Sequence, residues 1–117
     1  MKLIYLAGKL SGKTIWEREK NIREAEEAAL RIMKKLDVAV FCPHTQTRFY
    51  GDEMEWQEWI DRDLEVLKRC DAIYFVGDYW RDSKGAMAEY QFALRQEIPI
   101  FESYDMLKYW LTEGAGA

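Results

Sequence analysis

Short apolar runs alternate along this chain with longer amphipathic segments, and this alternation restricts the fold more than any other feature. Strands that alternate with helices form one parallel sheet covered by helices on both faces. Right-handed crossovers leave 2-1-3-4 as the simplest strand order. We therefore predict an α/β fold: a single three-layer domain of the flavodoxin or Rossmann-like type. The predicted strands are residues 2–7, 38–42, 72–76 and 98–101, and the predicted helices are 15–36, 54–69, 86–96 and one capped by Ser103 or Asp105.

Length and charge limit the classes of function. The 117 residues suit one domain, which we place at residues 1–112, with 113–117 as a flexible tail. A formal net charge of −4 argues against a nucleic-acid polymer as partner, although small anions remain possible. No apolar run approaches the roughly 20 residues of a membrane span. Lys9 and Lys13 interrupt the only apolar stretch near the N-terminus, so we expect a cytoplasmic protein.

The sequence contains no pattern typical of a metal site. Cys42 and Cys70 have neither metal-ligand nor redox spacing, and His44 is the single histidine. Two reduced, buried thiols are the simpler interpretation of the cysteines. We therefore expect no metal and no cofactor.

Two polar loops follow the first and third predicted strands, at residues 8–13 and 77–85. In the order 2-1-3-4, the carboxyl ends of these two strands flank the switch point, where open α/β sheets bind ligands. The first loop has two glycines and two lysines around a serine, which suits close approach to an anion. A plain turn between strand and helix is the alternative for that loop.

Glu89 is the most informative single residue. Its neighbours three and four positions away on the predicted helix are Gly85, Ala86, Phe92 and Ala93, so this face is small and apolar. Such a face packs on the sheet or lines a pocket. The alternative is a surface acid favoured by the helix dipole near the helix start. In a pocket, a carboxylate can act as the nucleophile at an electrophilic carbon.

Asp63 is a second acid in an apolar setting. It falls within the apolar stripe of the predicted helix 54–69, three residues after Ile60 and four before Leu67. A buried carboxylate is unfavourable unless it is paired, and such groups are enriched in active sites. The alternative is a residue at the edge of the stripe that reaches water or pairs with an arginine.

Two further residues have both a structural and a functional interpretation. His44 follows Pro43 at the carboxyl end of the second strand, and is either a hydrogen-bonded loop residue or a ligand contact. We predict that residues 45–53, which follow it, form a polar loop with two aromatic residues, Phe49 and Tyr50. Ser83 is either the N-cap of the third predicted helix or an anion ligand, together with nearby amides.

The order and spacing of three motifs resemble the nucleoside 2-deoxyribosyltransferase superfamily, which includes nucleotide N-glycosidases and small phage-type members. The resemblance covers residues 2–101. It is carried by the strand and glycine at 4–8, by Asp63-Leu64 followed by Asp71-Ala72-Ile73, and by the motif at 83–89, Ser-Lys-Gly-Ala-Met-Ala-Glu. The sequence departs from typical members at Lys9, at the bulky segment 80–82, and at Lys84 and Met87.

The resemblance implies roles for individual residues. Glu89 matches the nucleophile that attacks the anomeric carbon of the sugar and displaces the base. Asp63 matches the aspartate that assists protonation of the leaving base or orients the nucleophile. Ser83 matches a phosphate ligand of the nucleotide-cleaving members, and His44 matches a histidine after their second strand. Members of the superfamily commonly form homodimers or higher homo-oligomers in which a neighbouring subunit completes the site.

Two functions of different classes follow. The first is an enzyme that cleaves or transfers the N-glycosidic bond of a (2′-deoxy)nucleoside or a nucleoside 5′-monophosphate. The second is a non-catalytic nucleotide-binding or sensing module that does not depend on Glu89. In a third interpretation, the chain is a structural subunit whose aromatic residues form an interface. We expect Glu89 and Asp63 to be catalytic, and the substrate to contact Tyr5, Gly8, Lys9, His44, Asp82, Ser83 and Gly85.

Overall fold

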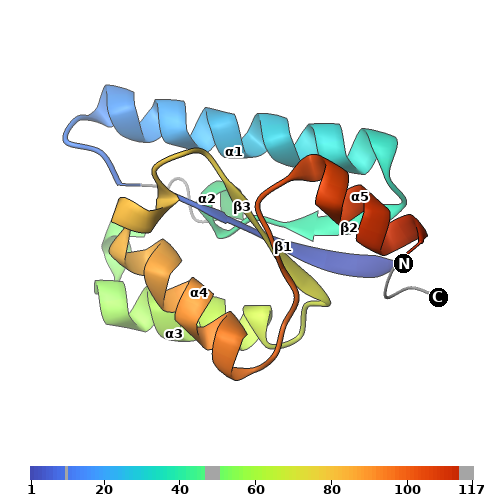
Figure 1. Cartoon of the computed structure of the whole chain (residues 1–117). Helices are drawn as coiled ribbons and strands as arrows, with labels where there is room; N and C mark the ends of the chain where they lie inside the picture. The colour runs from blue at the N-terminus through green and yellow to red at the C-terminus, as the bar shows by residue number, and fades with distance from the viewer. Residues whose placement is uncertain (10, 47–50, 114–117) are drawn as a thin grey trace.

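The computed structural model describes residues 1–9, 11–46 and 51–113, with the side chains of residues 44, 46 and 51 excepted. A four-stranded parallel sheet lies at its centre, in the order β2-β1-β3-β4, which confirms the predicted fold and strand order (Figure 1). The strands are β1 (Lys2–Gly8), β2 (Val38–Phe41), β3 (Ala72–Val76) and β4 (Ile100–Phe101). The helices are α1 (Ile15–Lys35), α2 (Pro43–Gln46), α3 (Trp56–Leu67), α4 (Lys84–Arg95) and α5 (Tyr104–Thr112), with 3₁₀ turns η1 (Gly51–Glu53) and η2 (Trp80–Asp82).

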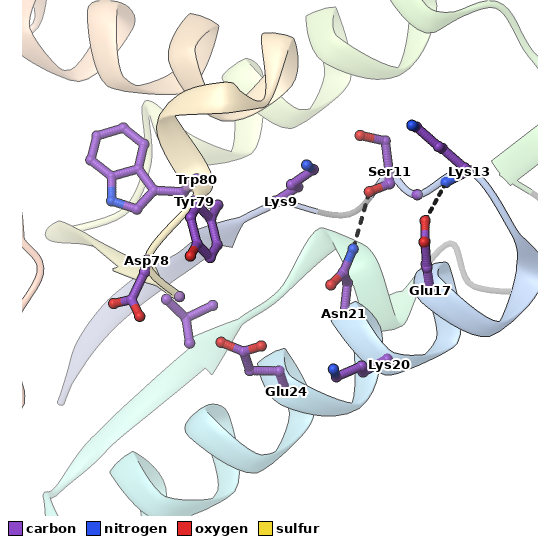
Figure 2. A pocket seen from close by; sticks show the side chains of 13 residues that line it. Lys9, Ser11, Lys13, Glu17, Lys20, Asn21, Glu24, Asp78, Tyr79 and Trp80 are labelled. Carbon is purple, nitrogen blue, oxygen red and sulfur yellow. Dashed lines mark hydrogen bonds between the residues drawn. The ribbon is translucent and has the colours of Figure 1, made fainter.

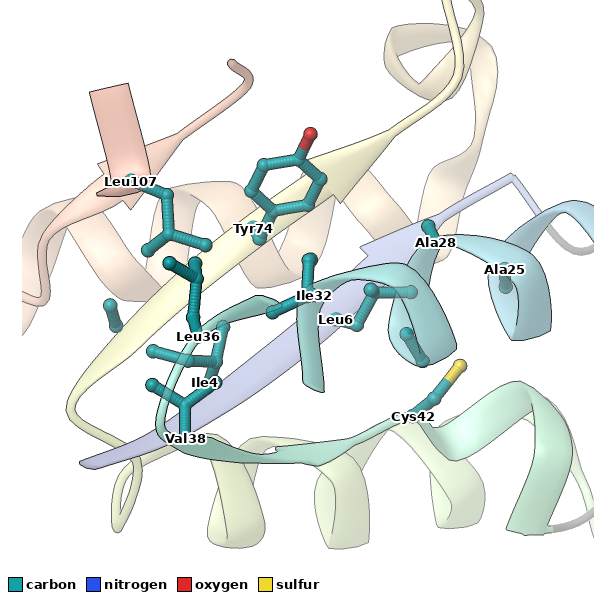
Figure 3. Close-up of a cluster of buried hydrophobic side chains, with 12 residues drawn as sticks. Ile4, Leu6, Ala25, Ala28, Ile32, Leu36, Val38, Cys42, Tyr74 and Leu107 are labelled. Atoms are coloured by element: carbon teal, nitrogen blue, oxygen red, sulfur yellow. The ribbon is translucent and has the colours of Figure 1, made fainter. Parts of the chain in front are cut away.

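Helices cover both faces of the sheet. α1 and α5 lie on one face, and α3 and α4 lie on the other (Figure 1). Because side chains alternate along a strand, Ile4 and Leu6 of β1 pack against α1, as Figure 3 shows, while Tyr5 and Ala7 face α3 and α4. The second face is the one from which Glu89 approaches the sheet.

Local sequence signals explain most of the helix boundaries. Ser83 and Ser103 cap α4 and α5, and each side-chain oxygen accepts a hydrogen bond from the backbone three residues later. The cap at Ser83 places the start of α4 two residues earlier than the predicted residue 86. β4 begins at Ile100, two residues later than predicted.

The region after β2 differs from the sequence prediction. We predicted a polar loop from residue 45 to 53, but a short helix occupies Pro43–Gln46, and a 3₁₀ turn occupies Gly51–Glu53. The prediction that Phe49 and Tyr50 interrupt this loop lies outside the described residues, as does the predicted tail from residue 114 onward. None of the described helices combines the length and the apolar character that crossing a membrane requires.

Candidate active site

Glu89 lies in the second turn of α4 and points toward the sheet. Its side chain is only 4% exposed, which rules out the surface position considered from the sequence. The hydroxyl group of Tyr5, a fully buried residue of β1, donates a hydrogen bond to the Glu89 carboxyl group. The hydrogen bond from Tyr5 of β1 therefore fixes the orientation of the Glu89 side chain.

The surroundings of Glu89 favour its neutral form. Burial raises the pKa of Glu89 to about 8, the hydrogen bond from Tyr5 lowers it, and the nearby charge of Asp63 raises it. Burial and the proximity of Glu89 also raise the pKa of Tyr5 well above its usual value, so this hydroxyl keeps its proton and remains a donor. Glu89 thus carries a proton at neutral pH in the free protein.

Asp63 approaches from the neighbouring helix. It lies on the inner side of α3, half-buried, and burial raises its pKa to about 6. Within the described part of the chain, no hydrogen bond or ion pair joins Asp63 to another residue. The arginine partner considered from the sequence is therefore not found there.

One cavity of about 610 Å³ lies between α3, α4 and the end of β1, and we call it the Glu89 cavity. Both acids line it, together with Gly8, Ser83 and Gly85. A volume of this size is typical of sites for small molecules. The cavity thus brings five of the nine predicted site residues together. Tyr5 does not line the cavity, but it is hydrogen-bonded to Glu89, which does.

The start of α4 supplies hydrogen-bond donors to the same cavity. Ser83 is 8% exposed, and its side-chain oxygen accepts the amide hydrogen of Ala86 at 3.2 Å, so its own hydroxyl hydrogen is not used in this bond. The amides of Lys84 and Gly85 are first in the helix and have no acceptor within it. The ammonium group of Lys84 lies 4.1 Å from the centre of the Trp56 ring, which joins α4 to α3 at the cavity.

For three predicted contact residues, the structure shows no side chain in the Glu89 cavity. Lys9 lines a second cavity, on the α1 side (Figure 2). Asp82 is exposed and does not line the Glu89 cavity. His44 belongs to α2 at the carboxyl end of β2, but its side chain lies outside what the structure describes. Contacts between these three residues and a substrate remain predictions.

The structure adds residues that the sequence did not single out. Arg18, which we interpreted as part of a solvated helix surface, lines the Glu89 cavity and lies 3.9 Å from Asp52. Trp56 and Trp59, assigned only to the apolar stripe of α3, also line it. Helical spacing places Trp56, Trp59 and Asp63 on one side of α3, and that pattern is the only signal in the sequence for this aromatic wall.

Comparison with known proteins identifies the family. Residues 2–102 match the family described as a domain of unknown function (DUF4406), and the chain belongs to this family. No curated protein matches the chain.

A solved structure of a 2-deoxyribosyltransferase from the psychrotolerant bacterium Bacillus psychrosaccharolyticus is similar to this one. That enzyme is described as a biocatalyst for the synthesis of antiviral and antitumoral nucleosides. The TM-score is 0.58 and the sequence identity is 21%, over 90% of this chain and 78% of the other. At this identity, the similarity shows a shared fold, and it agrees with the resemblance seen in the sequence motifs.

Proposed function

We propose that this protein cleaves or transfers the N-glycosidic bond of a (2′-deoxy)nucleoside or a nucleoside 5′-monophosphate, with Glu89 as nucleophile. The observation that carries the proposal is the arrangement of two acids from different helices, Glu89 and Asp63, along one cavity. The shared fold with a 2-deoxyribosyltransferase supports the same class of chemistry.

The first step breaks the bond between sugar and base. An oxygen of the ionised Glu89 carboxylate attacks C1′ of the sugar, and the C1′–N bond breaks with its electron pair going to the base. In the reactive form the single proton of the pair has moved from Glu89 to Asp63, and the carboxyl group of Asp63 gives this proton to the leaving base. The hydrogen bond from Tyr5 stabilises the ionised form of Glu89 before the attack.

The second step releases the sugar. Water or a second base attacks C1′, the ester bond to Glu89 breaks, and the proton of the attacking group returns to Asp63. Attack by water makes the protein a hydrolase, and attack by another base makes it a transferase. Both outcomes need the same two acids, so the proposal covers both.

A 5′-monophosphate suits the donors around the cavity. Ser83, the first amides of α4 and the cations of Lys84 and Arg18 border the same space as Glu89. Amides at a helix start and nearby cations are the groups that proteins use to bind phosphate. These groups support a phosphorylated substrate in preference to a free nucleoside.

Incubation with a panel of nucleosides and their 5′-monophosphates, with chromatographic detection of free base, tests the proposal. We expect base release from at least one 2′-deoxy substrate, faster for the monophosphate than for the nucleoside. Addition of a second base distinguishes transfer from hydrolysis. Absence of free base from every member of the panel contradicts the proposal.

A second candidate is a nucleotide-binding module without catalysis. The observation that favours it is the raised pKa of Glu89, because a protonated carboxyl group is a hydrogen-bond donor and not a nucleophile. In that case, calorimetry shows binding of a monophosphate that Glu89→Gln leaves unchanged, and no base is released. Loss of turnover with retained binding in the same variant favours the enzyme instead.

We predict a bell-shaped pH profile for kcat/KM, with a rise near pH 6 and a fall near pH 8. In the reactive form, Asp63 and Glu89 together carry one proton. This form predominates at pH values between the pKa of Asp63, about 6, and the pKa of Glu89, about 8. Asp63→Asn is expected to lower kcat by about 100-fold and to remove the fall at high pH. Initial rates at a series of pH values provide the measurement. Asp61→Asn, at an exposed position of α3, is the matched control.

We also predict that Gly85→Ala raises the stability of the protein and lowers its affinity for the ligand. A Cβ atom at this position meets only Trp56 Nε1 at 3.8 Å and Ser83 Oγ at 3.9 Å, which are ordinary contacts, and it projects at the Glu89 cavity. Alanine is the better helix former, so the free energy of unfolding is expected to rise by up to about 1 kcal/mol. Ligand affinity is expected to fall about tenfold, because the methyl group occupies ligand space.

Urea unfolding and calorimetry with a 5′-monophosphate measure the two effects of Gly85→Ala. Gln91→Ala, on the exposed side of α4, is the control for helix propensity alone. If Gly85→Ala binds the monophosphate as tightly as the wild type, the ligand does not reach the start of α4.

A further inference from the structure

A second cavity, of about 650 Å³, lies on the α1 side of the sheet, and we call it the α1 cavity. It is bounded by residues 9 and 11–13 after β1, by α1 and by the segment that follows β3 (Figure 2). The carboxyl ends of β1 and β3 adjoin it, so this cavity, like the Glu89 cavity, lies at the switch point of the sheet. The two acids of the proposed reaction, Glu89 and Asp63, line the other cavity.

Three lysines line the α1 cavity and make no ion pair within the described part of the chain. They are Lys9 and Lys13 from the loop and Lys20 from α1. Figure 2 shows Lys9 at the end of β1 and Lys20 on α1. Unpaired ammonium groups that border one cavity favour an anionic ligand.

Acceptors and an aromatic ring complete the lining. The carboxyl groups of Glu17, Glu24 and Asp78 also border the cavity, as many acids as there are lysines. Carboxylates accept hydrogen bonds from the hydroxyl groups of a ribose. Tyr79 is 71% exposed, so its ring is available for stacking with a base. The side chain of Asn21 donates to the carbonyl group of Ser11 at 3.0 Å and holds the loop against α1, which gives the cavity a fixed wall.

These groups select one class of ligand. Charged side chains on every wall disfavour an apolar molecule, and no group of three or more His, Cys, Asp or Glu side chains suitable for a metal ion occurs among the described residues. Phosphate, sugar hydroxyls and a base each have a matching group here. We propose that the α1 cavity is a second ligand site and that it binds a nucleoside phosphate.

The α1 cavity shares parts of its wall with the Glu89 cavity. Ser11 lines both cavities, and Trp80, which lines the α1 cavity, lies three residues before Ser83 of the Glu89 cavity. The intervening segment is held as a unit: Trp80 stacks on Phe75 with ring centres 4.0 Å apart and donates to Glu102 at 3.0 Å. The two cavities are therefore neighbours in the fold, and the assignment of a reaction to the Glu89 cavity rests on the proposed function.

An NMR titration with AMP tests the second site. The protein carries Glu89→Gln to prevent turnover, and backbone amide signals are followed as AMP is added. We expect shifts at Asn21, Gly77 and Tyr79 that saturate separately from shifts at Ser83 and Trp59. Replacing Lys13 and Lys20 with glutamine is expected to weaken the first response about tenfold or more and to leave the second in place.

The matched control replaces Lys34 and Lys108, two exposed lysines distant from the cavity, with the same loss of charge. Tyr79→Ala provides an independent variant, because its exposed ring contributes little to folding. Absence of AMP-induced shifts at Asn21, Gly77 and Tyr79, or equal affinities in the lysine variants and their control, overturns the proposal. Since base release is assayed separately, failure of the proposed catalysis leaves this result unaffected.

Discussion

Replacing Glu89 with glutamine is expected to lower base release by about 10³-fold or more. The amide has no negative charge with which to attack C1′, and the proposed covalent step depends on that attack. Glutamine has nearly the same shape, and its side-chain oxygen still accepts the hydrogen bond from Tyr5, so the fold is expected to persist. Free base released from the monophosphate panel, measured by chromatography, gives the rate for each variant.

The control for this substitution is Glu27→Gln, at an exposed position of α1, which makes the same change of charge without touching the cavity. It is expected to keep the wild-type rate. Equal base release by the Glu89→Gln variant and the wild type shows that another group performs the chemistry. Tyr5→Phe refines the test, because it removes the donor to Glu89 and leaves the carboxyl group in place.

The sequence was sufficient to predict the sheet and the burial of Glu89. Strand order follows from the alternation of elements and the handedness of crossovers. The burial of Glu89 follows from the small neighbours on its face of the helix, because helical spacing is a local property. Asp63 was predicted to lie inward for the same reason, and the structure places both acids along one cavity.

Other features depend on tertiary geometry that local patterns do not contain. The hydrogen bond from Tyr5 to Glu89 joins residues 84 positions apart, and no spacing rule predicts it. Alternation along β1 would continue from Tyr5 and Ala7 to place residue 9 toward α3 and α4, yet Lys9 lines the α1 cavity. Lys9 lies beyond the last residue of β1, Gly8, so the strand pattern no longer sets its direction. Arg18 reaches the Glu89 cavity because the start of α1 lies beside it, and the helical pattern alone indicated only a charged surface.

Stability is expected to fall as the pH rises from about 4.5 to about 8, because Glu89 stays protonated in the folded protein while it is ionised in the unfolded chain. The pKa of this carboxyl group is raised from 4.5 to about 8 by burial, so the folded protein binds more protons than the unfolded chain throughout this window. At about 1.4 kcal/mol for each pKa unit, Glu89 removes several kcal/mol from the free energy of unfolding by pH 8. Above pH 8 the loss is complete.

The Glu89→Gln variant isolates this contribution. Its side chain does not ionise, so the free energy of unfolding of the variant minus that of the wild type is expected to be small at pH 5 and to reach several kcal/mol at pH 8. Urea unfolding at pH 5, 6, 7 and 8 measures the difference. The pKa of Glu102 is lowered by Arg81, which gives the opposite pH dependence, but this contribution is present in both proteins and cancels.

The two expected effects of Glu89→Gln have opposite signs, and together they distinguish a catalytic acid from a structural one. A structural carboxyl group contributes stability that is lost on replacement, whereas Glu89 is expected to destabilise the folded protein at the pH where its ionised form performs the chemistry. A difference in unfolding free energy that stays constant between pH 5 and pH 8 indicates that Glu89 ionises normally in the folded state. In that case, burial by α4 and β1 does not control its charge, and the pH profile proposed for base release has no basis.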